Sequence, residues 1–92
     1  MIARRIVIRG QVQGVGFRFA LVDAARESGV AGWVRNRFDG TVEALVQGES
    51  RATERMIEWC RRGPPGARVI DVDVTDVPVD PLLTDFAQRP TL

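Results

Sequence analysis

The spacing of hydrophobic residues predicts a strand followed by a helix in the first third of the chain. Within residues 5–12 apolar and polar positions alternate, which places Ile6, Ile8 and Val12 on one side of a strand. A glycine-containing turn follows. Between residues 17 and 28 the apolar positions change to the spacing of an amphipathic helix, and Gly29 is a typical residue for the end of that helix.

A hairpin and a second helix are expected next. A strand over residues 31–38 ends at Asp39-Gly40, which favours a two-residue type I′ turn, and residues 41–47 form the returning strand. Ser50 can cap the second helix. The apolar stripe of that helix keeps i, i+3, i+4, i+7 spacing at Thr53, Met56, Ile57 and Cys60.

Two strands complete the predicted fold. Ile70, Val72 and Val74 alternate with polar residues in a fourth strand, and residues 84–89 add a short fifth. The order is that of an α+β, ferredoxin-like βαββαβ sandwich, an antiparallel sheet with two helices on one face. We expect residues 1–92 to form a single domain, because a chain of this length supports one core.

The predicted topology brings two distant segments to one edge of the sheet. The first and second strands run in the same direction with the third between them, so their carboxyl ends lie on the same edge. The glycine turn and Asn36 are therefore expected about 10 Å apart, which is two strand spacings. A small anion fits between them.

Composition narrows the chemistry that this edge can perform. All 13 basic residues are arginine against 12 acidic ones, and the chain has no lysine, histidine or tyrosine and a single cysteine. A Ser-His-Asp or Cys-His nucleophile, a Walker A loop and a four-ligand zinc site are therefore excluded. The remaining groups are arginine, carboxylates, hydroxyls, the single asparagine and backbone N–H groups.

The turn Gly14-Val15-Gly16 has the composition of an anion-binding loop. Successive backbone N–H groups there can form a nest, and the N-terminus of the following helix adds positive partial charge. Arg18, in the first helical turn, can bind a phosphate through paired hydrogen bonds. The alternative is a structural turn with a solvated arginine. The turn does not match the dinucleotide-binding fingerprint, because Phe19 stands where the third glycine belongs.

Asn36 is the second candidate residue. Strand parity places it on the side of Val34 and Phe38, an unusual position for an amide without a polar partner. One interpretation is that Asn36 is a polar residue near a turn without a functional role. Beside an anion loop, its side-chain carbonyl can instead orient a water molecule by accepting one of its protons.

Two long motifs resemble the acylphosphatase family. GQVQGVGFR at residues 10–18 is similar to its first signature, and GWVRNRFDGTV at residues 32–42, continuing to Gly48, is similar to its second. Residues 86–89 are similar to the family's closing strand, so the resemblance covers nearly the whole chain. Gln11 stands where a basic residue is common, and residues 90–92 extend past the usual end.

The resemblance implies hydrolysis of acyl phosphates to a carboxylate and inorganic phosphate by water attack on phosphorus. It implies that Arg18 binds the substrate and stabilises charge, and that Asn36 positions the water. It also implies a loop that holds the phosphoryl group, formed by Gln13, Gly14, Val15, Gly16, Phe17 and Arg18. No metal or other cofactor is expected. Such a site suffices because a carboxylate with a conjugate-acid pKa of about 4 leaves without a general acid.

Further expectations concern partners and location. A small-molecule acyl phosphate is the expected substrate of a cytoplasmic monomer. The net charge of +1 argues against nucleic acid, and no apolar run approaches the length of a membrane helix.

Two other functions are compatible with parts of the same pattern. A regulatory domain with an inactive anion site is one, and an RNA-recognition module has the same element order but needs aromatic residues that residues 5–12 and 41–47 lack. Cys60 lacks the arginine of a Cys-x₅-Arg phosphatase loop, since position 66 is Gly66. The acidic row Asp71, Asp73 and Asp76 is interpreted as a solvated strand face rather than a metal site.

Overall fold

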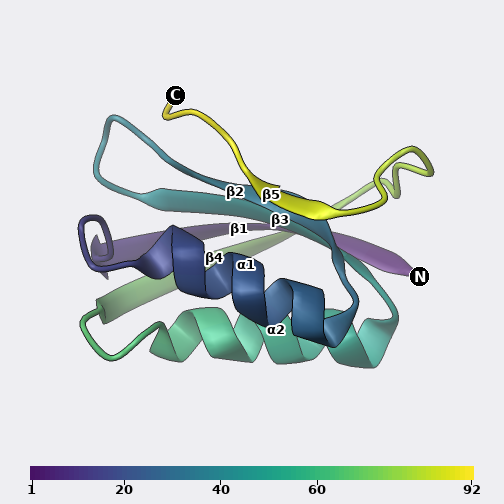
Figure 1. Ribbon diagram of the computed structural model, residues 1–92, viewed down its shortest axis with the longest axis horizontal. Coiled ribbons are helices and arrows are strands. Elements are labelled where there is room, and N and C mark those ends of the chain that lie inside the picture. Colours follow the sequence, from purple (N-terminus) through teal and green to yellow (C-terminus); the bar gives the residue numbers. More distant parts are fainter.

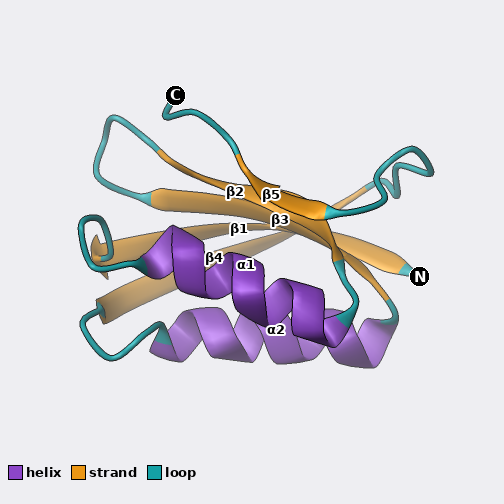
Figure 2. Cartoon of the chain, viewed as in Figure 1, coloured by secondary structure: helices purple, strands orange, loops and turns teal.

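The computed structural model describes residues 1–92 as two helices packed on one face of a five-stranded sheet (Figures 1 and 2). This is the ferredoxin-like arrangement that the element order predicts. The elements in chain order are β1 (Ile2–Gln11), α1 (Phe17–Ser28), β2 (Ala31–Asn36), β3 (Val42–Gly48), α2 (Ser50–Arg62), β4 (Arg68–Val77) and β5 (Phe86–Gln88).

The sheet has the strand order β4-β1-β3-β2-β5. β3 pairs antiparallel with both β1 and β2, so β1 and β2 are parallel and end at the same edge, as expected. The predicted antiparallel pairing holds for β4, β1, β3 and β2, and a further strand joins at one border. After β4 the chain crosses to the opposite border and adds β5 parallel to β2, which makes the sheet mixed.

The segment that crosses to β5 is tied to the middle of the sheet by one side chain. Gln47 donates through Nε2 to the Asp80 carbonyl oxygen and accepts from the Asp80 N–H, both at 2.8 Å. After β5 the chain continues along β2. Its last residue, Leu92, donates its N–H to the Asn36 carbonyl oxygen and accepts from the Phe38 N–H.

The core lies between the sheet and the helices. Ile6, Ile8 and Val12 are at most 1 % exposed, as strand alternation predicts. All four predicted core positions of α2 are buried: Thr53, Met56, Ile57 and Cys60. α1 ends at Gly29 as expected, since the Gly29 N–H donates to carbonyl oxygens of the last helical turn. Neither helix is long and apolar enough to cross a membrane.

The β2–β3 turn differs from the predicted type I′ turn. Such a turn needs positive φ at both central residues, but only Gly40 has one, at 93°. The Arg37 N–H donates to the Thr41 carbonyl oxygen, so three residues form the loop. The Asp39 carboxylate accepts from the Thr41 N–H and hydroxyl at 3.0 and 2.7 Å, which stabilises this longer turn.

The predicted cap of the second helix is also wrong. Glu49 is the N-cap residue, and no side chain caps the helix. The Glu49 carbonyl oxygen already accepts the Thr53 N–H at 2.9 Å, so Ser50 is the first helical residue and lies too late in the chain to act as the cap.

β4 contains a bulge that interrupts its predicted alternation. Arg9 pairs with Asp71 and Gly10 with Val69, so Ile70 has no partner on β1. The extra residue shifts the parity of the strand. Val69 consequently packs against the core, and Ile70 is 76 % exposed.

Candidate active site

The loop between β1 and α1 turns sharply at two glycines. Gly14 and Gly16 have φ angles of 74° and 78°, in the left-handed region that other residues rarely adopt. Gly16 is the N-cap of α1 and offers no side chain to the helix end. Every helix leaves its first N–H groups without an intrahelical acceptor, and here no side chain caps them. These N–H groups are therefore available to an anion.

A cavity of about 170 Å³ joins this loop to the end of β2. It confirms the expectation that the two segments meet at one edge of the sheet. Its walls are formed by the glycine loop, the first turn of α1 and the ends of two strands, through Val12, Gly14, Gly16, Phe17, Arg18, Phe19, Asn36 and Gln88.

Arg18 brings a guanidinium group to this cavity. The side chain is half-buried and takes part in none of the chain's salt bridges. A guanidinium carries five N–H donors in a planar fork, which matches two oxygens of a phosphate. The cavity thus contains one unneutralised positive charge beside free backbone donors.

Asn36, the last residue of β2, lies on the other side of the cavity. Its side-chain oxygen Oδ1 is buried and has no hydrogen-bond donor within the protein. Val34 shares its face and is fully buried, as parity predicts, whereas Phe38 is 84 % exposed because the chain leaves the strand after Asn36. A buried carbonyl without a donor is costly, so this oxygen is suited to accept from a water or a ligand.

Two of the predicted loop residues lie outside the cavity wall. Gln13 directs its side-chain Nε2 to the carbonyl oxygens of Arg37 and Thr41, at 2.8 and 2.9 Å. Val15 packs against the core and faces Gly66. Gln13 therefore connects the glycine loop to the β2–β3 hairpin, a contact between segments that motif spacing does not reveal.

A second cluster, on the sheet face away from the helices, was not predicted. The Glu43 carboxylate is only 3 % exposed and accepts from Arg5, Arg35 and Arg37 at 2.6, 2.7 and 3.0 Å. Burial disfavours its charged form, but these hydrogen bonds outweigh burial and lower the pKa of Glu43 below 4.5. An acidic residue among apolar neighbours in β3 was the one sequence signal for this cluster.

The other candidates from sequence are accounted for by local contacts. Arg9 pairs with Asp73 at 2.6 Å and with Asp71 at 3.7 Å on an exposed strand face, as the solvated-face interpretation predicts. Cys60 is a buried free thiol, and burial raises its pKa to about 12, so it is protonated at neutral pH. No group of three or more acidic, cysteine or histidine side chains suited to a metal is present.

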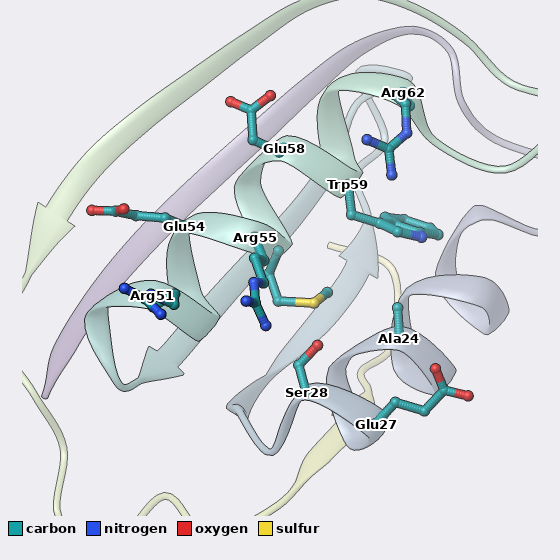
Figure 3. Close-up of a pocket in the computed structure, with 10 residues that line it drawn as sticks. Ala24, Glu27, Ser28, Arg51, Glu54, Arg55, Glu58, Trp59 and Arg62 are labelled. Atoms are coloured by element: carbon teal, nitrogen blue, oxygen red, sulfur yellow. The ribbon is translucent and has the colours of Figure 1, made fainter.

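The largest cavity of the molecule, about 540 Å³, lies elsewhere. It is a groove between α1 and α2, and Figure 3 shows Trp59 extending from α2 toward Ala24 on α1. Charges of both signs line it in equal number: Glu27, Glu54, Glu58, Arg51, Arg55 and Arg62. It contains neither glycine loop nor unpartnered buried acceptor, so the smaller cavity at Arg18 and Asn36 is the better candidate site.

Comparison with known proteins identifies the family of the chain. Residues 4–88 match the family model described as Acylphosphatase. The chain is 50% identical to acylphosphatases of Rhizorhabdus wittichii and Acidiphilium cryptum, over 99% of its length and 91% and 99% of theirs. It superposes on the crystal structure of acylphosphatase from Bacillus subtilis with a TM-score of 0.92 and 37% identity, covering 97% of this chain and 99% of that one. The chain therefore belongs to the acylphosphatase family and hydrolyses acyl phosphates.

Proposed function

We propose that the cavity at Arg18 and Asn36 is where this acylphosphatase cleaves its substrate, by direct attack of water on phosphorus. The observation that carries the proposal is that one small cavity joins an arginine without a salt-bridge partner to a buried carbonyl oxygen without a donor. The arginine suits the phosphoryl oxygens, and the carbonyl suits the attacking water.

Arg18 and the loop amides bind the phosphoryl group and stabilise charge on its equatorial oxygens. Phosphoryl transfer passes through a loose transition state, so positioning and charge stabilisation provide most of the acceleration. Gly14 and Gly16 let the backbone approach the anion closely, and the free N–H groups of α1 add donors.

Asn36 orients the water by accepting one of its protons through Oδ1. A new P–O bond forms from the water oxygen, and the bond from phosphorus to the acyl oxygen breaks, with its electron pair leaving on the carboxylate. A phosphoryl oxygen of the substrate takes the proton of the water. The carboxylate needs no general acid, since the pKa of its conjugate acid is about 4.

Hydrolysis of benzoyl phosphate in the presence of EDTA tests this assignment. We expect an active wild type and a loss of about 10²-fold or more in kcat/KM for Arg18→Gln and for Asn36→Ala. Arg55→Gln, which removes an exposed arginine on α2, is the matched control. Full activity in either site variant, or no activity in the wild type, contradicts the proposal.

A regulatory domain with an inactive anion site is the first alternative. Only a measurement of substrate turnover distinguishes it from an active enzyme, because both can bind phosphate.

An RNA-recognition module is the second alternative, and the residues of the sheet disfavour it. The one tryptophan of the sheet, Trp33, has the guanidinium groups of Arg35 and Arg89 over its ring at 4.6 and 4.8 Å, which compete with a stacked base.

We also propose that the chain acts as one domain and as a monomer in the cytoplasm, without a nucleic-acid partner. The near-neutral charge and the free thiol of Cys60 support this setting. A dimer mass in light scattering contradicts the monomer. Salt-sensitive retention of RNA on filters contradicts the absence of a nucleic-acid partner.

A further inference from the structure

A second cavity, of about 290 Å³, adjoins the proposed phosphate site. The two cavities share Phe19 and Gln88 in their walls, so they lie side by side on the surface. The walls of the second one are Phe19, Val22, Asp23, Arg26, Ala87 and Gln88.

This second cavity is a groove between α1 and β5. Its four helical residues have i, i+3, i+4, i+7 spacing and therefore lie on one face of α1. Arg26 holds that face against the strand, because its Nη2 donates to the Phe86 carbonyl oxygen at 3.1 Å. Seven helical residues span about 10 Å, which is the length of the groove from Phe19 to Arg26.

The helical wall nearest the phosphate site is apolar and open, and Gln88 is the polar residue that both cavities share. Phe19 is 69 % exposed, and Val22 lies one helical turn further along. Asp23 and Arg26 make the far end polar. A ligand that enters from the phosphate site therefore contacts the Phe19 ring first and meets charged groups only after several ångströms.

We propose that this groove binds the acyl portion of the substrate, and that it favours acyl groups with a short apolar or aromatic body. The inference rests on the proposed function, since the phosphoryl group in the first cavity leaves the acyl group to extend outward. Phe19 stands at the exit of that cavity and gives a ring or branched chain an apolar surface. A two-carbon acyl group is too small to cover the ring.

The test compares benzoyl phosphate with acetyl phosphate in the wild type and in Phe19→Ala. We expect kcat/KM for benzoyl phosphate to fall about fivefold to tenfold more than kcat/KM for acetyl phosphate, the change that matches loss of about 50 Å² of apolar contact. Most of the fall is expected in KM. Phe19→Leu, which keeps an apolar side chain, restores part of the difference.

Phe38→Ala is the matched control. It is the same substitution at a ring that is 84 % exposed, lies in the β2–β3 turn and borders none of the cavities. Its benzoyl-to-acetyl ratio of kcat/KM is expected to equal that of the wild type. Competitive inhibition by inorganic phosphate, measured alongside, reports on the phosphate site alone and is expected to change far less than the benzoyl KM in Phe19→Ala.

The outcomes separate the two proposals. The acyl groove is contradicted, and the phosphate site is not, if the wild type hydrolyses both substrates but Phe19→Ala lowers kcat/KM for both by equal factors. The same conclusion follows if Phe19→Ala weakens inhibition by phosphate by the same factor as it raises the KM for benzoyl phosphate. If the wild type hydrolyses neither substrate, the proposed function itself fails.

Discussion

The side-chain amide of Gln13 donates a hydrogen bond to the main-chain oxygen of Arg37 at 2.8 Å. The two residues are 24 positions apart in the chain, and Arg37 directly follows Asn36. A second bond, at 2.9 Å, reaches the Thr41 carbonyl oxygen on the other side of the turn. One side chain thus holds the glycine loop against the strand end that carries Asn36.

We expect Gln13→Ala to lower kcat about tenfold or more while KM changes less. Without the amide, the loop and Asn36 are free to move relative to each other, and small displacements of reacting groups cost large factors in rate. Steady-state kinetics with benzoyl phosphate measures the split between kcat and KM. Gln13→Glu, which has similar size but no N–H donors, is expected to lose a similar factor in kcat.

Gln11→Ala is the control for this prediction, since Gln11 is exposed and forms none of the side-chain hydrogen bonds in this loop. Its kcat is expected to match the wild type. Gln13→Ala with unchanged kcat shows that the link has no role in positioning.

The Glu43 cluster predicts that stability falls in acid. The pKa of Glu43 is lowered in the folded protein, so its contribution is fully present above its ordinary value near 4.5 and is lost as pH falls through the folded value. We expect Glu43→Gln to lower the free energy of unfolding by about 1–3 kcal/mol at pH 7, because three arginines lose their carboxylate. Urea unfolding at pH 7 and at acid pH measures both effects.

Asp73→Asn is the comparison for Glu43, because its ion pair with Arg9 is exposed and screened by solvent. Asp73→Asn is expected to lower the free energy of unfolding at pH 7 by less than Glu43→Gln does. Equal stability losses in the two variants, or an acid dependence unchanged by Glu43→Gln, contradict the prediction.

The rate of hydrolysis is expected to show no side-chain titration near pH 6.5. The proposed site has arginine and asparagine but no group that titrates near neutrality, and the chain has no histidine. The measurement is kcat for benzoyl phosphate across about pH 5.5–7, at constant ionic strength. An inflection that a substitution in the chain removes is incompatible with the proposed mechanism.

Gly16→Ala is expected to destabilise the protein by about 1–2 kcal/mol through the backbone alone. The residue has φ 78°, and an added Cβ meets no atom within 4 Å, so no clash contributes. Gly66→Ala is the control, since Gly66 has no left-handed φ and its added Cβ makes ordinary contact with Val15 at 3.6 Å. Thermal unfolding compares them, and a Gly16→Ala variant as stable as Gly66→Ala removes the argument for a strained loop.

Local chemistry was sufficient to predict the element order, the core faces of β1 and α2, and the meeting of Arg18 with Asn36 at one sheet edge. Hydrophobic period, glycine position and strand direction are properties of short segments, so they can be predicted without coordinates. The two errors at segment ends, the hairpin turn and the cap of α2, arose where Asp39 and Glu49 formed bonds that residue preference alone does not distinguish.

Tertiary structure decided the relationships between distant segments. The bulge that exposes Ile70 depends on the register between β1 and β4, and the parallel placement of β5 depends on the path of the chain across the sheet, which Gln47 contacts at Asp80. The Gln13 link likewise joins parts of the chain whose separation in sequence carries no signal. The sequence alone determined which residues can do the chemistry and at which sheet edge Arg18 and Asn36 meet, whereas only packing decided the Gln13 contact and the size and walls of the cavities, because hydrogen bonds and cavities form between surfaces that folding brings together.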